Sequence, residues 1–193
     1  MLPPDARDTP LVTPRRFTLE EYHRLVDVGV LGEDEHVELL EGVIVEMTPQ
    51  GRAHMLVVTR LTRVLVRTLS DAYSVRPQGP LSLEGDSEPE PDIAVVTREE
   101  EERAEVHPRT ALLVVEVAGD SLRKDRQLKG RIYARAQVRE YWIVDVARKS
   151  VEVYTEPDVD AGRYRALRTL GAGETLGSAV LPGLALPVAE LFA

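Results

Sequence analysis

The chain has 193 residues, of which 24 are Lys or Arg and 33 are Asp or Glu, so its formal net charge is −9. This length is typical of one globular domain, and a chain without cysteine cannot form a disulfide, a thiolate nucleophile or a Cys-ligated metal site, which fits a reducing cytoplasm. No run of about 18 uncharged apolar residues is present, which excludes a membrane-spanning helix.

The N-terminal part is predicted to contain a tail followed by a helix. Residues 1–16 contain four prolines and no apolar stretch of the length that a signal peptide needs, so we expect a flexible tail. Residues 17–193 are then expected to form a single folded domain. Thr18 and Glu21 have the spacing of a capping box, which predicts that a short helix begins here.

The middle of the chain alternates between strand and helix patterns. Gly42 precedes a β-branched run at 43–45, which predicts a turn into a strand. Apolar residues at helical spacing predict a helix from Arg52 to Leu69. Three short apolar runs have the character of buried strands. These runs are 93–96, 111–117 and 141–146.

The second half completes a mixed α/β pattern. A helix capped by Asp120 or Ser121 is expected between the last two strands, and residues 151–155 and 163–170 are expected to form a hairpin. The chain is predicted to end in short strands or turns. Together these elements indicate an α/β or α+β fold with a central mixed sheet, flanking helices and additional β-hairpins.

Two acidic residues stand out because they interrupt or open apolar strands. Glu116 lies within the run at 111–117, where a buried carboxylate is costly unless it is paired, protonated or bound to a metal. Asp92 precedes the run at 93–96 and follows Pro91. If the two strands are neighbours, a hard cation would bridge both carboxylates. The alternatives are a turn role for Asp92 and an arginine partner for Glu116.

Three further charged positions are candidates with equally ordinary alternatives. Lys129 follows Asp125 by four residues on the predicted helix, a spacing that usually indicates a surface ion pair. Glu38 and Glu41 flank Leu39 and Leu40, and either acid would be unremarkable if it were solvated.

The order and spacing of these segments resemble the Uma2 family of bacterial predicted endonucleases. The resemblance is carried by VELLEGVIVEMTP, GRAHMLVVTRL, EPEPDIAVV and LLVVEVAGDSLRKDRQLKGRIYARAQVREYWIVDV, and it extends from about Phe17 to near the C-terminus. This family belongs to the PD-(D/E)XK nuclease superfamily. The resemblance therefore implies a restriction-endonuclease-like fold, with a central mixed sheet flanked by helices.

The resemblance also implies a set of site residues. The family's PD motif matches Pro91–Asp92, and its second acid matches Glu116. The superfamily lysine is absent two positions after Glu116, where this chain has Ala118, and the family pattern points instead to Lys129, with Lys124 as the second choice. The acid of the first superfamily helix corresponds to Glu38, or failing that to Glu41. His54, Asp125, Tyr133 and Tyr141 match family positions without an assigned role.

The implied activity is metal-dependent hydrolysis of DNA phosphodiester bonds. Asp92 and Glu116 would hold Mg²⁺ or Mn²⁺, Lys129 would assist the attacking water, and Glu38 would complete the outer shell of the metal. The resemblance also implies a homodimer. One alternative is a catalytically inactive nuclease fold that serves as a DNA-binding or protein-interaction module, and another is an enzyme that acts on RNA or a different phosphodiester.

The distribution of charge removes an apparent objection to nucleic acid as the partner. A net charge of −9 argues against binding to phosphates, which depends on Lys and Arg. Residues 84–105 contain ten acids and two bases, however, whereas residues 121–139 contain seven bases and one acid. Residues 52–67 add four arginines and no acid. The sequence thus predicts basic helices beside an acidic pocket.

Overall fold

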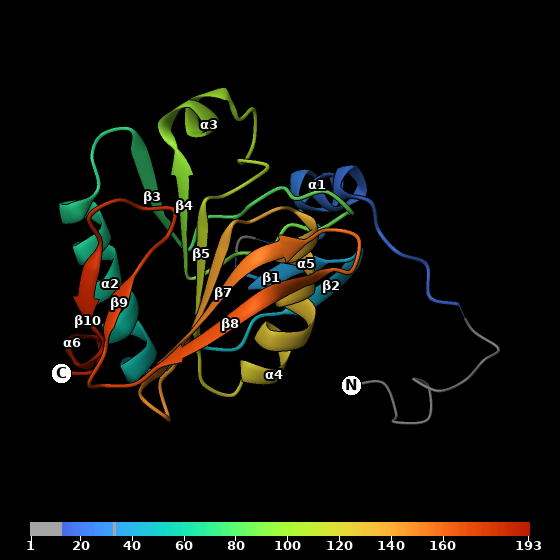
Figure 1. Cartoon of the computed structure of the whole chain (residues 1–193). Coiled ribbons are helices and arrows are strands. Elements are labelled where there is room, and N and C mark those ends of the chain that lie inside the picture. The colour runs from blue at the N-terminus through green and yellow to red at the C-terminus, as the bar shows by residue number, and fades with distance from the viewer. Residues whose placement is uncertain (1–12, 33) are drawn as a thin grey trace.

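The centre of the protein is a six-stranded mixed sheet in the order β3-β4-β5-β6-β7-β8 (Figure 1). The structure is a computed structural model that describes residues 13–32 and 34–193. Most of the predicted N-terminal tail lies outside these residues. The strands are β3 (Tyr73–Pro77), β4 (Ile93–Thr97), β5 (Leu113–Ala118), β6 (Glu140–Asp145), β7 (Ser150–Asp158) and β8 (Arg163–Leu170). Within this sheet only β5 and β6 are parallel, as expected for two strands joined through a helix.

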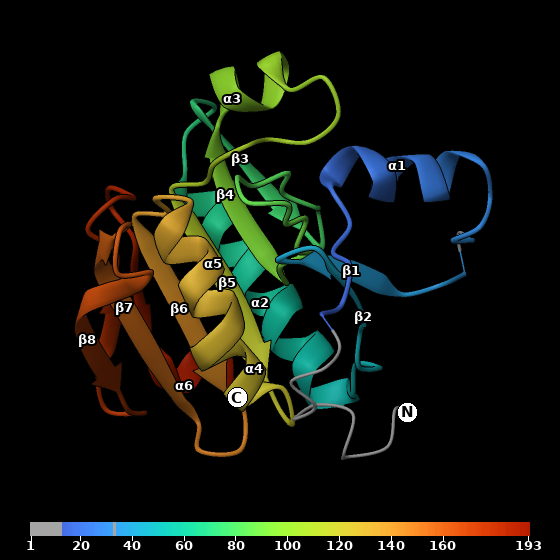
Figure 2. The same cartoon turned by 90° about the vertical axis from the view of Figure 1, so that its right-hand side faces the viewer.

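Helices cover both faces of this sheet (Figure 2). On one face lies α2 (Arg52–Thr68), which buries Leu61 and Leu65 against β4, β5 and β6. On the other face runs a helix in three parts, namely α4 (Leu122–Lys124), the π-helical turn η2 (Asp125–Lys129) and α5 (Gly130–Arg135). The apolar side chains form two separate cores, one on each face of the sheet.

The remaining elements form smaller layers at the margins of the sheet. A helix, α1 (Leu19–Asp27), begins at the predicted capping box of Thr18 and Glu21. The hairpin β1 (Val37–Leu40) and β2 (Val43–Glu46) turns at Gly42, whose φ of 77° favours glycine. The other elements are α3 (Arg98–Arg103), β9 (Thr175–Gly177), β10 (Ala185–Pro187) and α6 (Val188–Leu191). Among the described residues, no helix combines the length and apolar character needed to cross a bilayer.

The structure confirms the predicted fold class and most of its elements. The predicted strand at 43–45 is one arm of the β1–β2 hairpin, and the acidic run at 99–102 lies within the exposed helix α3. One prediction was too simple, because the helix after β5 is interrupted by the π-helical turn η2. The edge strand β3 was not predicted, because the segment Tyr73–Pro77 includes Arg76 and Pro77 and lacks a clear alternation of apolar residues.

Candidate active site

Glu116 lies on the face of β5 that is covered by the helix running from α4 to α5. Side chains alternate along a strand, so Glu116 shares its face with Val114 and Ala118, which belong to the core on this side. Val115 and Val117 point to the opposite core. Glu116 is only 5% exposed, so its carboxylate needs partners from the helix above it.

Asp92 lies next to Glu116 because β4 and β5 are antiparallel. Ile93 is paired with Val115, and one step further along this register Asp92 comes level with Glu116. The Asp92 carboxylate accepts a hydrogen bond of 2.7 Å from the backbone N–H of Val117. The His54 Nε2 atom lies 2.9 Å from Asp92 Oδ1. Asp92 is therefore fixed toward β5, and the predicted proximity of the two acids is correct.

The π-helical turn η2 aligns side chains that a straight α-helix would spread apart. Ser121, Asp125, Lys129 and Tyr133 follow one another at intervals of four residues. In an α-helix each such interval overshoots a full turn by about 40°, so three intervals drift by roughly 120°. The i→i+5 bond from the Gly130 N–H to the Asp125 carbonyl widens the middle turn and offsets part of that drift. Lys129 and Tyr133 consequently both reach Glu116.

Lys129 joins two buried carboxylates that come from different parts of the fold. Its Nζ atom lies 2.9 Å from Glu116 Oε1 and 2.9 Å from Glu38 Oε2. Glu38 is 1% exposed, so the alternative of a solvated side chain is wrong for this residue. A surface pair between Lys129 and Asp125 is wrong as well. Both residues are buried, and the Asp125 carboxylate accepts its hydrogen bond from Ser121.

Tyr133, which had no assigned role in the sequence analysis, contacts Glu116 directly. Its hydroxyl donates a 2.7 Å hydrogen bond to Glu116 Oε1, the same oxygen that Lys129 contacts. Tyr141 stabilises the π-helical turn η2, because its hydroxyl donates a 3.1 Å hydrogen bond to the Asp125 carbonyl. The four-residue spacing from Ser121 to Tyr133 was the available sequence signal. It could not show which strand the tyrosine would meet.

Burial and the lysines shift the pKa values of the two acids in opposite directions. Burial raises the pKa of Glu116 to about 8, and the neighbouring ammonium of Lys129 only partly offsets this. Burial also acts on Glu38, but the charges of Lys129 and Lys124 outweigh it and lower its pKa. For Lys129 the carboxylates of Glu116 and Glu38 outweigh burial, so its pKa is raised and it carries a positive charge.

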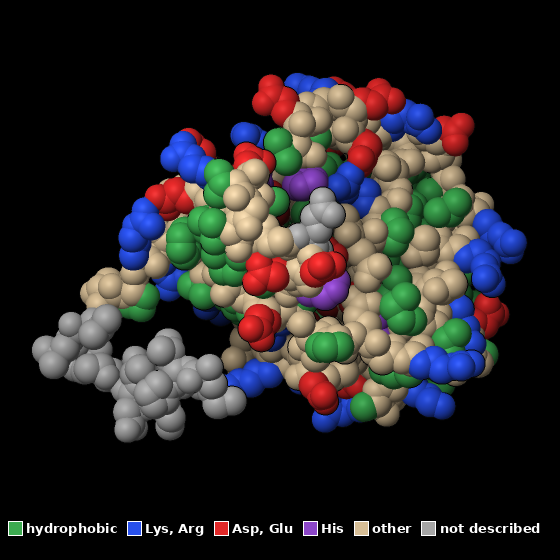
Figure 3. Space-filling view, turned by 180° about the vertical axis from the view of Figure 1, so that it is seen from behind, with side chains coloured by type: hydrophobic (Ala, Val, Ile, Leu, Met, Phe, Trp, Pro, Cys, Tyr) green, Lys and Arg blue, Asp and Glu red, His purple; other side chains and the backbone are tan. Residues whose placement is uncertain are grey.

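These groups line a cavity of about 220 Å³ at the end of β5. The cavity contains all four of the predicted site residues, Glu38, Asp92, Glu116 and Lys129. Lys124, the second choice for the lysine, also lines it and contacts Glu38 at 2.9 Å. Glu41, the second choice for the acid, lies outside this cavity and is bound by Arg131 and Arg135. Figure 3 shows acidic and histidine side chains near the middle of the face seen from behind, and both basic and acidic side chains along its margin.

Comparison with known proteins assigns the chain to a family. The model of Uma2, described as "Putative restriction endonuclease", matches residues 19–189. The chain belongs to the Uma2 family. A solved structure with the same fold is described as a putative nuclease belonging to DUF820 from Anabaena variabilis. It is 17% identical, with a TM-score of 0.69, and the match covers 91% of this chain and 97% of that one. The search of curated proteins finds no match.

The donor set of this Uma2 protein fits a hard divalent cation that keeps part of its water shell. Among residues 13–32 and 34–193, no group of three or more His, Cys, Asp or Glu side chains is arranged to hold a metal ion by itself. Mg²⁺ usually takes one or two carboxylates together with water and substrate phosphate, rather than a cage made only of protein atoms. Asp92 and Glu116 supply two such carboxylates on one wall of the cavity.

Two glutamines were missed as functional candidates: Gln50, which lines the cavity, and Gln78, which contacts Gln50. Gln50 donates to Asp92 Oδ1 at 3.3 Å, and it accepts a hydrogen bond from Gln78. His54 contacts the same carboxylate, although histidines in such places are more often structural. No local pattern distinguishes Gln50 and Gln78, because they belong to loops that meet only in the folded chain.

Proposed function

We propose that this Uma2 protein is a metal-dependent endonuclease that hydrolyses DNA phosphodiester bonds. The observation that carries the proposal is the placement of Lys129 within 2.9 Å of Glu116, in the cavity that also contains Asp92. A binding module without catalysis does not require a buried lysine held between carboxylates, because such a group is costly to desolvate.

The four predicted site residues divide three tasks among them in the proposed reaction. Asp92 and Glu116 would bind Mg²⁺ or Mn²⁺, which stabilises charge on the phosphoryl oxygens and lowers the pKa of a bound water. Lys129, held by Glu38 and Glu116, would orient the attacking water and neutralise the developing negative charge. Glu38, for which the resemblance implies a place in the outer shell of the metal, contacts Lys124 and Lys129 and would act by holding the ammonium of Lys129 next to Glu116. Attack of the water oxygen on phosphorus would break the P–O bond to one sugar. The proton released from the water would pass to solvent, and the departing sugar oxygen would take up a proton from solvent.

The proposal includes an assembly and a location. We propose that residues 17–193 act as one nuclease unit and that two copies form a homodimer, so that each site addresses one DNA strand. A chain without cysteine that acts on DNA is suited to the cytoplasm. Light scattering at micromolar concentration tests the dimer, and a monomer there would contradict it.

Cleavage assays test the proposed chemistry directly. Purified protein with Mg²⁺ or Mn²⁺ is expected to cleave duplex, nicked or single-stranded DNA, and Asp92→Ala and Glu116→Ala are each expected to abolish cleavage. Glu102→Ala, an exposed substitution on α3, is the matched control for contaminating nucleases. The proposal fails if no nucleic acid is cleaved or if Asp92→Ala and Glu116→Ala cleave as well as the control. Cleavage of RNA alone would assign the same site to a different substrate.

A further inference from the structure

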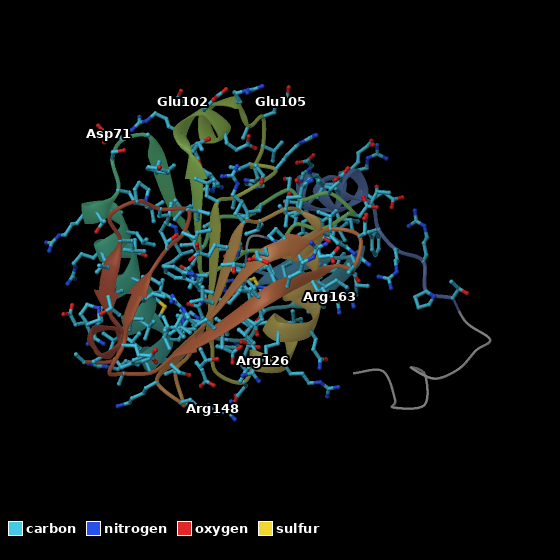
Figure 4. The ribbon with its side chains drawn as sticks, viewed as in Figure 1. Asp71, Glu102, Glu105, Arg126, Arg148 and Arg163 are labelled. Carbon is cyan, nitrogen blue, oxygen red and sulfur yellow. The ribbon has the colours of Figure 1, made fainter. Side chains whose placement is uncertain are left out.

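A group of exposed basic side chains and the acidic helix α3 lie at opposite ends of the sheet. The strand β4 has Asp92 immediately before its first residue and is followed at its other end by α3, with the acidic run at 99–102. The acids of the candidate site and the acids of α3 thus lie at opposite ends of one strand. Figure 4 shows Glu102 and Glu105 at one end of the molecule and Arg126 and Arg148 at the other.

Several basic side chains gather at the end of the sheet where the cavity opens. β5 and β6 are parallel, and Ala118 is paired with Asp145, so both strands end at this edge. The helix after β5 and the turn after β6 therefore begin side by side. We call the basic residues around this end the basic edge. They are Arg52, Arg123, Arg126, Arg148 and Lys149.

The basic edge keeps its charge exposed to solvent. Arg126 and Arg148 each contact a buried carboxylate, Glu152 or Asp145, yet their side chains remain 38% and 68% exposed. Arg123 and Lys149 are exposed and form no ion pair with a described residue. Glu152, Asp145 and the exposed Asp120 offset three of the five positive charges, so the basic edge keeps an excess of two.

We infer that the basic edge receives the phosphate backbone of the DNA substrate and delivers it to the cavity, while the acidic end at α3 faces away from it. The inference rests on the proposed function for the identity of the polyanion. A net charge of −9 repels DNA from most directions, so the excess of positive charge at the basic edge, beside the cavity, orients the approach of the DNA. Each cation that contacts a phosphate releases a counterion, which makes the inference measurable as a salt dependence.

The test compares two double substitutions that remove the same charge from opposite ends of the sheet. Arg123→Gln with Lys149→Gln neutralises two unpaired cations of the basic edge. Arg139→Gln with Arg163→Gln is the matched control, because Arg139 precedes β6 and Arg163 opens β8, both at the far end. Arg163 is paired with Asp158, the last of the nine residues of β7. Since a strand rises about 3.3 Å per residue, Arg163 lies about 25 Å from the β6–β7 turn.

Binding of a fluorescently labelled duplex is measured by anisotropy in Ca²⁺ over a series of salt concentrations. The edge variant is expected to bind roughly tenfold more weakly, and its plot of log K against log salt is expected to be shallower by about two. The control is expected to match the wild type. The inference is overturned if both variants lose the same affinity, if neither loses affinity, or if the wild type does not bind.

A separate measurement distinguishes this inference from the proposed function. Hydrolysis of bis(4-nitrophenyl) phosphate by the wild-type protein with Mn²⁺ tests the cavity without involving the basic edge. Absence of hydrolysis together with binding that depends on Arg123 and Lys149 would reject the nuclease proposal and retain the DNA-binding edge. Hydrolysis together with binding that is insensitive to the edge would retain the nuclease and reject the inference.

Discussion

The hydroxyl of Tyr133 donates a 2.7 Å hydrogen bond to Oε1 of Glu116, the oxygen that also receives the ammonium of Lys129. Two donors on one oxygen fix the rotation of the carboxylate and leave Oε2 as the oxygen available to a ligand in the cavity. Tyr133 is thus expected to position Glu116 for metal binding, in the way that outer-shell hydrogen bonds orient metal ligands.

Removal of the Tyr133 hydroxyl is predicted to weaken metal binding more than it weakens the fold. Tyr133→Phe is expected to lower Mn²⁺ affinity about tenfold or more, because Glu116 loses one of its two fixed donors. Its cost in stability is expected to be only about 1–2 kcal/mol. Tyr164→Phe is the control, since the Tyr164 hydroxyl donates to the carbonyl of Val138, away from the cavity. Calorimetric titration with Mn²⁺ measures the effect, and equal affinities in the two variants would contradict a positioning role.

The two lysines at Glu38 are predicted to differ sharply when each is replaced by methionine. Lys129→Met is expected to abolish cleavage and to cost roughly 3–5 kcal/mol, because Glu116 loses its cation and Glu38 is left with Lys124 alone. Lys124→Met is expected to retain cleavage and to cost about 1 kcal/mol or less, since its side chain is partly exposed and contacts Glu38 alone. Urea unfolding and DNA cleavage measure the two effects. Loss of cleavage in Lys124→Met alone would move the catalytic assignment to Lys124.

Metal affinity is predicted to rise with pH. Burial raises the pKa of Glu116 to about 8, so below that pH its carboxyl is protonated and competes with the metal. Since metal ligands bind in their deprotonated form, Mg²⁺ affinity is expected to increase as pH rises through about 8 and to decrease as it falls. Calorimetric titration of the wild type over this range tests the expectation. Glu116→Gln is expected to bind weakly without that pH dependence, and a flat profile in the wild type would refute the assignment.

A buried acid elsewhere in the sheet is predicted to serve the fold alone. Glu140 is 1% exposed, accepts the indole N–H of Trp142 at 2.7 Å, and fixes the turn at Ser178 and Ala179. Glu140→Ala is expected to cost roughly 2–4 kcal/mol because it leaves buried donors unpaired. Urea unfolding measures this loss, and metal binding by the folded variant is expected to remain unchanged. A cost below about 1 kcal/mol would show that these donors find other partners.

The sequence by itself determined most of the elements and singled out the two acids. Several features depend only on residues that are close together in the sequence, so their patterns predict them directly. They are the capping box at Thr18, the helix beginning at Arg52 and the apolar runs around Asp92 and Glu116. Lys129 and Glu38 were candidates with ordinary alternatives, and the family pattern gave them their expected roles. The edge strand β3 escaped prediction because strand pairing, rather than its own composition, holds it in place.

Only the tertiary structure decided which partners these residues meet. Spacing along the chain favoured Asp125 as the partner of Lys129, whereas in the folded chain Lys129 contacts Glu116 on β5 and Glu38 on β1. The tertiary structure also decided where the charged side chains lie. Composition gives −9, but the direction of β4 places the acids of α3 at the far end from the cavity. Sequence patterns report neighbours along the chain, while a site of this kind is made by residues that strand register and helix packing bring together.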